Sequence, residues 1–303
     1  MTQQIARQLS GTAGRLSGWH AAALLVALAS ATAWGITSLA AAGAGGDVDI
    51  ALIVSVDISE SVDDKRFHLQ MNGIANALED PAVVATMTSG QHHAILVSLL
   101  AWSDKSETAI PWVRISSKAD ATAVADRVRN LPRYTGEFTC LARMFRFVSD
   151  NIVGNLPVPA SRVVIDVSGD GVDNCSTEEA TISARDDLVA KGVTINGLPI
   201  IEEPDRIVGE GAYRAPGGGM QYLKPLESRE RLNLEGWYTK YVMGGEGAFI
   251  LPANGYADFD RAMRQKFVTE ISEAIQGGAA ERRGLVRRPR FVMPRSEPTR
   301  GQG

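Results

Sequence analysis

Five polar side chains stand where predicted strands end or a predicted helix begins, and each of them offers oxygen atoms. Asp57, Ser59 and Ser61 follow the apolar run "ALIVSV". Thr139 opens a predicted helix after a glycine-containing loop, and Asp170 stands between two glycines after the apolar run "RVVIDV". Hard cations such as Mg²⁺, Mn²⁺ and Ca²⁺ prefer oxygen ligands, whereas zinc sites use histidine or cysteine. Because ligands bind at the carboxyl ends of parallel strands, these residues predict a divalent-cation site.

Each of these patterns has a simpler alternative when it is taken alone. Ser61 or Asp63 could cap the helix that begins there. The spacing Asp-x-Ser-x-Ser is loose and occurs by chance in chains of this length. Asp173 and Asn174, beside Asp170, could bind a second cation or make a turn, and their residue types favour the turn.

The elements that must position these residues alternate along the chain, which is typical of an α/β fold. Apolar, β-branched runs predict strands at 49–56, 93–102, 108–113, 162–167, 194–200 and 248–251. Helical spacing of apolar residues predicts helices at 67–78, 121–131, 139–152, 178–191 and 259–271. The segment 202–234 lacks either pattern, and we expect it to be an insertion, either a functional loop or disordered.

The motifs "DISES", "FTCLARMF" and "SGDG" resemble the metal-ion-dependent adhesion site of von Willebrand factor type A domains. The chain is similar, more closely still, to a family of exported bacterial proteins of unknown function with that fold. This second resemblance is carried by "RVVIDVSGDG", "GVTINGLPI" and "GGEGAFI" before the last amphipathic helix. Both resemblances cover about residues 47–276.

The resemblance implies a doubly wound, mostly parallel, six-stranded sheet with one antiparallel edge strand, which we expect at 108–113. It also implies that two serines and a threonine bind the cation while two aspartates hold ordered waters. These roles fall to the five residues Asp57, Ser59, Ser61, Thr139 and Asp170. Thr135 lies in the same loop, but Thr139 is preferred because apolar residues at core-facing spacing follow it directly.

The chain has two cysteines, Cys140 and Cys175. In an exported protein an even count indicates a disulfide, and two free thiols are the alternative. Cys140 is next to the expected ligand Thr139, and Cys175 follows Asp170 on a neighbouring loop of the same sheet edge. We therefore predict a disulfide between them.

The two ends of the chain differ in composition from the predicted domain at 47–276. Residues 21–42 carry no charge and end in small residues, which predicts that segment 1–46 is a signal peptide or a membrane anchor. The chain is thus expected to be periplasmic or secreted. Segment 277–303 is rich in arginine and predicts a disordered basic tail, either solvated or in contact with an anionic membrane surface. The net charge of −4 gives no reason to expect a nucleic-acid partner.

These features favour a divalent-cation-dependent module, with Mg²⁺ or else Mn²⁺ or Ca²⁺, that binds a Glu or Asp carboxylate of a protein partner. A metal-dependent hydrolase is an alternative, but the position of a general acid, two residues after Asp57, is occupied by Ser59. Serine hydrolysis lacks support because the sequence contains no Gly-x-Ser-x-Gly motif. A degenerate scaffold domain is the third hypothesis.

Overall fold

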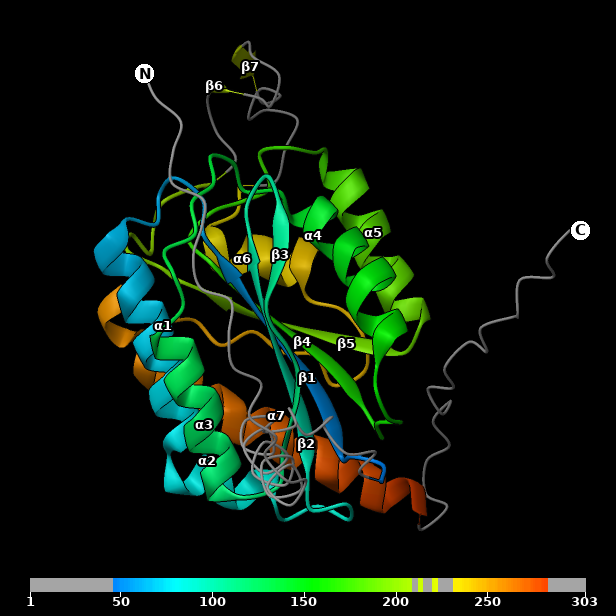
Figure 1. Ribbon diagram of the computed structural model, residues 1–303. Coiled ribbons are helices and arrows are strands. Elements are labelled where there is room, and N and C mark those ends of the chain that lie inside the picture. The colour runs from blue at the N-terminus through cyan, green and yellow to red at the C-terminus, as the bar shows by residue number, and fades with distance from the viewer. Residues whose placement is uncertain (1–45, 209–211, 215–219, 223–230, 283–303) are drawn as a thin grey trace, which may run out of the picture. The chain divides into compact units, whose positions relative to one another are not determined.

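A central five-stranded sheet organises the fold in the computed structural model, which describes residues 46–208, 212–214, 220–222 and 231–282 (Figure 1). The strand order is β3-β2-β1-β4-β5, and every neighbouring pair is parallel except β2 and β3. This confirms the doubly wound sheet with one antiparallel edge strand. The strands are β1 (Ile50–Asp57), β2 (Ile95–Trp102), β3 (Ser106–Ile115), β4 (Val163–Gly169) and β5 (Val193–Pro199).

The prediction of a sixth strand at 248–251 is wrong. This segment lies beside β5, but it makes only isolated bridging contact with that strand. Its backbone still bonds to the sheet, since the amide of Leu251 donates to the carbonyl of Gly197 at 3.0 Å. Pro199 lacks the N–H group that a continuous ladder would need between the bonds at Gly197 and Ile201. The segment nevertheless covers the edge of β5, which would otherwise expose unpaired backbone groups.

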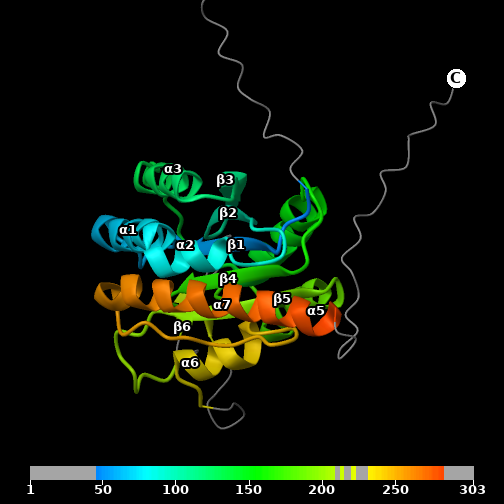
Figure 2. The ribbon, with the colours of Figure 1, turned by 90° about the horizontal axis from the view of Figure 1, so that it is seen from below.

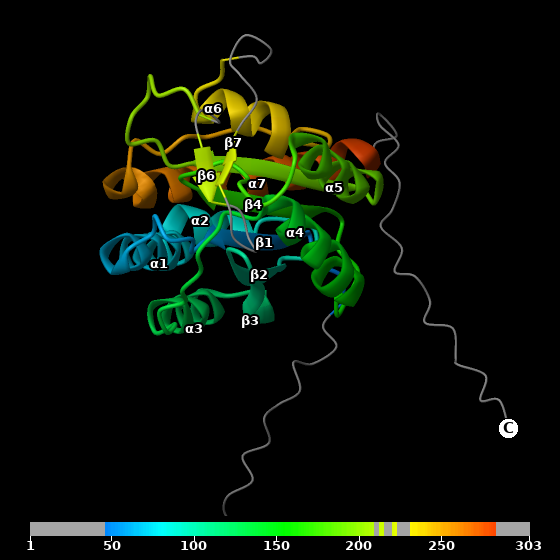
Figure 3. The same ribbon diagram turned by 90° about the horizontal axis from the view of Figure 1, so that it is seen from above.

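Helices cover both faces of the sheet, and Figures 2 and 3 show α1 and α3 on one side and α4 and α5 on the other. The α-helices are α1 (Asp64–Glu79), α2 (Pro81–Met87), α3 (Lys118–Arg129), α4 (Leu141–Phe147), α5 (Glu178–Ala190), α6 (Leu234–Trp237) and α7 (Phe259–Arg282). Short 3-10 or π segments are η1 (Val148–Ile152), η2 (Val153–Asn155), η4 (Tyr238–Val242) and η5 (Tyr256–Asp258). The five predicted helices are confirmed.

Side chains of β1 alternate between two hydrophobic cores, because successive residues of a strand point to opposite faces. Leu52 and Val54 join the core beneath α1, α3 and α7, whereas Ala51 and Ile53 join the core beneath α4 and α5. All eight residues of β1 are buried, which explains why the apolar run is nearly continuous. The run ends at Asp57, the last residue of the strand, after which the chain turns toward α1.

A cluster of charged side chains is buried between β4, β5 and α7. The ammonium of Lys266 lies 3.3 Å from Asp166 and 2.6 Å from Glu270, and all three side chains are inaccessible. Asn196 donates to Glu270 at 2.7 Å, and the Lys266 ammonium lies 4.5 Å from the ring centroid of Phe249. Burial raises the pKa of Asp166 well above its ordinary value, Lys266 opposes this effect, and Glu270 adds to it.

The predicted insertion 202–234 contains a small hairpin, β6 (Ala212–Arg214) and β7 (Met220–Tyr222). The predicted signal or anchor segment 1–46 and most of the basic tail lie outside the described residues. Helix α7 continues to Arg282, beyond the predicted domain end at 276. In the part of the chain that the structure describes, no helix has the length and apolarity needed to cross a membrane.

Candidate metal centre

The five predicted site residues come together at the carboxyl edge of the sheet. Asp57 is the last residue of β1 and Asp170 follows β4 directly, and these strands are parallel neighbours, so their ends meet. Ser59 and Ser61 lie in the turn between β1 and α1, and Thr139 lies just before α4. Three loops therefore deliver the five side chains to one place.

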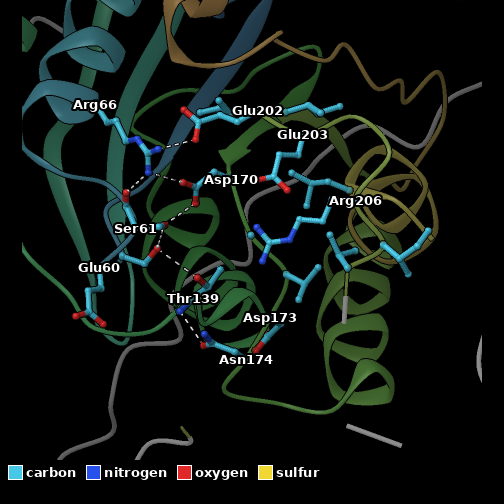
Figure 4. A pocket seen from close by; sticks show the side chains of 18 of the residues that line it. Glu60, Ser61, Arg66, Thr139, Asp170, Asp173, Asn174, Glu202, Glu203 and Arg206 are labelled. Atoms are coloured by element: carbon cyan, nitrogen blue, oxygen red, sulfur yellow. Dashed lines mark hydrogen bonds and ion pairs between the residues drawn. The ribbon is translucent and has the colours of Figure 1, made fainter. Parts of the chain in front are cut away.

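The hydroxyl oxygens of the site form a chain of short contacts (Figure 4). The Oγ atoms of Ser59 and Ser61 are 3.3 Å apart, and the hydroxyl of Thr139 donates to Ser59 at 3.3 Å. The hydroxyl of Ser61 donates to a carboxylate oxygen of Asp170 at 2.6 Å. Four side chains thus place their oxygens within one small volume.

Asp57 is the buried carboxylate of the site. One carboxylate oxygen accepts a hydrogen bond from the backbone amide of Ser59 at 2.8 Å, and the other is buried without a hydrogen-bond partner among the described residues. Burial raises the pKa of Asp57 to about 7, the charge of Asp170 adds to this, and the Ser59 bonds oppose it. A cation bound next to Asp57 would favour the ionised form of its carboxyl group.

These residues fit a hard divalent cation. Bonds to Mg²⁺ of 2.0–2.1 Å at right angles separate neighbouring ligand atoms by about 2.9 Å. The observed separations of 2.6 and 3.3 Å lie on either side of this value. Among the described residues, no group of three His, Cys, Asp or Glu side chains could hold a metal ion. The predicted set has only two carboxylates, and hydroxyls provide its remaining oxygens.

Asn174 positions Thr139, whereas the sequence had indicated Asn174 as part of a turn or, less favoured, as a ligand of a second cation. The amide of Thr139 donates to the side-chain oxygen of Asn174 at 2.9 Å. Thr135, the alternative in the same loop, is exposed. The predicted disulfide between Cys140 and Cys175 is confirmed, and it joins the same two loops.

The side chain of Asp173 stabilises both its own turn and the first turn of α4. Its carboxylate accepts hydrogen bonds from the amides of Ala142, Cys175 and Ser176 at 2.8 to 2.9 Å. The hydroxyl of Thr181 adds a fourth bond at 3.1 Å. Four bonds occupy this carboxylate, so the turn interpretation is favoured over a second cation site.

Sequence reasoning missed three residues around the aspartates. The hydroxyl of Tyr256 donates to Asp170 at 2.9 Å, and a guanidinium nitrogen of Arg66 lies 3.8 Å from the same carboxylate. Within the described part of the chain, the buried hydroxyl of Tyr238 has no hydrogen-bond partner. Burial raises the pKa of Tyr238, and the charges of Asp57 and Asp170 add to this effect. Only the tertiary structure brings these residues near, and no local pattern marks them.

A cavity of about 560 Å³ opens beside the candidate metal centre. Four of the five site residues, all except the buried Asp57, line one part of it. Part of the remaining wall comes from the two ends of the insertion, namely Glu202, Glu203, Arg206, Ile207, Val208 and Leu234 (Figure 4). Arg66 links the two parts, because its guanidinium bonds to the carbonyl of Ser61 at 2.6 Å and pairs with Glu202 at 2.5 Å.

Solved structures with a similar fold include proximal thread matrix protein 1 from the mussel byssus, at 16% identity and a TM-score of 0.47. That match covers 73% of this chain and 47% of the mussel protein, so this chain spans about half the length of that protein. A von Willebrand factor type A protein from Catenulispora acidiphila matches at 13% identity, with a TM-score of 0.44 and coverage of 75% and 43%. The conserved hypothetical protein BatB from Bacteroides thetaiotaomicron matches at 15% identity, with a TM-score of 0.44 and coverage of 74% and 99%.

At the level of sequence, no curated protein matches the chain significantly. A family profile does match, and it covers residues 47–275. The expected membership in a family of unknown function is thereby confirmed. The chain belongs to the family described as "Protein of unknown function (DUF1194)".

Proposed function

We propose that this chain is an exported protein-binding module that requires a divalent cation and recognises an acidic group of a protein partner. Asp57, Ser59, Ser61, Thr139 and Asp170 would hold the cation, with Mg²⁺ as the expected ion and Mn²⁺ or Ca²⁺ as substitutes. A cation bound there supplies a positive centre for a carboxylate of the partner. The composition of segment 1–46, which predicts a signal peptide or a membrane anchor, supports the export part of the proposal.

One observation supports this proposal: three hydroxyls and one carboxylate converge on one side of a pocket, and behind them the buried carboxylate of Asp57 bonds to the amide of Ser59 with only one of its oxygens. A buried carboxylate oxygen without a partner is unfavourable, and a cation would compensate for it. In the arrangement that the resemblance implies, the two aspartates hold ordered waters, and only uncharged hydroxyls contact the cation directly. The cation would therefore keep a net attraction for an anionic group from outside.

The chain's own residues keep the site in shape without the cation. Ser61 donates to Asp170, and Tyr256 donates to the second oxygen of the same carboxylate. Ser59 fixes one oxygen of Asp57 through its backbone amide. Because these hydrogen bonds fix the loops, we expect the site to need little rearrangement when it binds the cation.

Titration calorimetry of the purified chain with MgCl₂ and MnCl₂ tests the cation site directly. Ser59→Ala and Thr139→Ala should weaken binding roughly tenfold or more, since each removes a ligand oxygen. Thr135→Ala is the matched control, because Thr135 is an exposed threonine of the same loop and should change nothing. Equal cation affinity in all four proteins would reject the site.

Partner capture from the periplasmic extract of the source organism tests recognition. A partner should be released by a chelator and should bind again when Mg²⁺ is restored. It should also fail to bind Thr139→Ala while binding Thr135→Ala normally. Capture that is insensitive both to the chelator and to Thr139→Ala would make the site structural and favour the scaffold hypothesis.

A further inference from the structure

Arg206 places a cationic side chain in the cavity beside the candidate metal centre. Its guanidinium points into the cavity, toward the part where Ser61, Thr139 and Asp170 gather (Figure 4). The Arg206 side chain makes no hydrogen bond or ion pair with any residue that the structure describes. Arg66, the other arginine of the wall, is already paired with Glu202.

The backbone around Arg206 is held in place by the two ends of the insertion. The amide of Arg206 donates to the carbonyl of Glu203 at 3.1 Å, and Ile207 forms an antiparallel bridge with Asn233. The side-chain amide of Asn233 also donates to the carbonyl of Pro204 at 3.3 Å. Arg206 is therefore attached to a bonded turn, which lowers the entropic cost of using it to bind a ligand.

The wall near Arg206 is apolar. The contributing side chains are Ile200, Ile201, Ile207, Val208 and Leu234. Ile200 and Leu234 belong to the buried core, while the other three are partly accessible. The cavity volume of about 560 Å³ falls within the range of about 300–1,000 Å³ that is usual for ligand pockets. An apolar group of a ligand could be buried here.

Acidic side chains limit how much negative charge the cavity accepts. Glu60 and Glu203 line it and are exposed, and neither forms an ion pair within the described part of the chain. Among the residues that the structure describes, Arg206 is thus an unpaired cation beside carboxylates. This arrangement suits a ligand with a single carboxylate and opposes a run of acidic residues.

We infer that this pocket binds a peptide carboxylate that lies next to an apolar side chain. The guanidinium of Arg206 pairs with the carboxylate, and the wall formed by Ile200, Ile201, Ile207, Val208 and Leu234 packs against the apolar group. The inference rests on the proposed function, because the proposed cation ligands line the same pocket, and it adds the class of ligand. A free C-terminal carboxylate and an Asp side chain share this chemistry.

Four fluorescein-labelled peptides with one common Gly/Ser scaffold distinguish these sources by fluorescence polarisation in MgCl₂. The first ends in leucine with a free carboxylate, and the second is its C-terminal amide. The third is an amide with an internal Asp-Leu pair, and the fourth replaces that pair with Asp-Asp. The first or the third should bind, and the second and the fourth should bind at least roughly tenfold more weakly. No binding by either the first or the third peptide overturns the inference.

Variants separate the role of Arg206 from that of the cation. Arg206→Ala should weaken binding of the preferred peptide roughly tenfold, because it removes one charge-assisted contact. Arg206→Lys should restore part of this loss. Arg127→Ala, at an exposed arginine of α3, is the matched control and should bind like the wild type.

Calorimetry of Arg206→Ala with MgCl₂ completes the test, since this variant should retain the wild-type cation affinity. Wild-type peptide binding that needs Mg²⁺ but is unaffected by Arg206→Ala overturns the inference and leaves the proposed function intact. Peptide binding that is unaffected by the chelator but lost in Arg206→Ala supports the role of Arg206 and contradicts the requirement for a cation in the proposed function.

Discussion

Thr139 and Asn174 bond to each other in both directions. The amide of Thr139 donates to the side-chain oxygen of Asn174 at 2.9 Å, and the amide of Asn174 donates to the carbonyl of Thr139 at 3.0 Å. The disulfide between Cys140 and Cys175 joins the residues that follow each of them. Two loops of the candidate metal centre are thus connected by three adjacent links.

Asn174→Ala should weaken Mg²⁺ binding although Asn174 is not one of the proposed ligands. The substitution leaves the amide of Thr139 without its side-chain acceptor and loosens the hydroxyl that it positions. Losses of outer partners of this kind usually cost roughly tenfold in metal affinity. Calorimetry measures the effect, with Asn155→Ala, at an exposed asparagine outside the site, as the control. Equal affinity in the two variants would show that Asn174 does not position Thr139.

Removal of the disulfide should lower the free energy of unfolding. Cys140 and Cys175 are separated by 35 residues, and opening a loop of this size costs about 3 to 4 kcal/mol in the chain-entropy model. Urea denaturation of the double variant Cys140→Ala/Cys175→Ala, compared with the oxidised wild type, measures this. An unchanged midpoint and slope would mean that the link adds no stability. Mass spectrometry of the protein from its native compartment should find both cysteines oxidised.

Gly169→Ala should disturb the floor of the site. A Cβ atom at Gly169 would lie 2.7 Å from the hydroxyl of Tyr238 and 2.9 Å from a carboxylate oxygen of Asp57. Such overpacking usually costs about 1–3 kcal/mol. Gly171→Ala is the matched control, because the nearest atom to its Cβ would be the hydroxyl of Thr139 at 3.5 Å. If the two variants unfold at the same urea concentration, the floor is more adaptable than the contacts indicate.

Asp166 should make stability depend on pH. Because its pKa is raised in the folded protein, the folded state retains a proton that the unfolded state loses. The part of the stability that depends on Asp166 should therefore be fully present below the ordinary carboxyl range and should be lost as the pH rises from there toward the raised pKa. The slope from one such group is at most about 1.4 kcal/mol per pH unit.

Asp166→Asn should flatten this pH dependence, since asparagine does not titrate and Lys266 keeps its partner Glu270. Urea denaturation between pH 5 and neutral pH compares the variant with the wild type. Asp187→Asn, at an exposed aspartate of α5, should retain the wild-type slope. A slope in Asp166→Asn as steep as that of the wild type would show that Asp166 is ionised throughout this range.

Local patterns were sufficient to predict most of the fold. The continuous apolar run of β1 and the helical spacing from Phe67 to Leu78 depend on burial, which the residue types express directly. The strand expected at 248–251 was wrong because its residues lie beside β5 without forming a continuous ladder, and Pro199 of β5 lacks one of the N–H donors that such a ladder needs. Apolar composition indicates burial and does not guarantee continuous pairing.

The candidate site was predictable only in its inner part. Asp57, Ser59 and Ser61 follow one strand at short spacing, so sequence proximity reveals them. Tyr256 bonds to Asp170 across 86 positions of the chain, and Arg66 pairs with Glu202 across 136. Tertiary packing brings the two residues of each pair together, and no periodicity or motif in the sequence indicates that they are close. Arg206 was hidden for the same reason inside a segment without a regular pattern.

The path of the chain through the domain determines how the pocket could be presented. Strand β1 starts at Ile50 and reaches the site only at Asp57, so the chain enters at the opposite edge of the sheet. Helix α7 starts at Phe259, close to Tyr256, and its 24 residues extend about 36 Å back toward that edge (Figure 1). A tether at either end would therefore hold the domain by its base and leave the pocket facing away from the attachment surface.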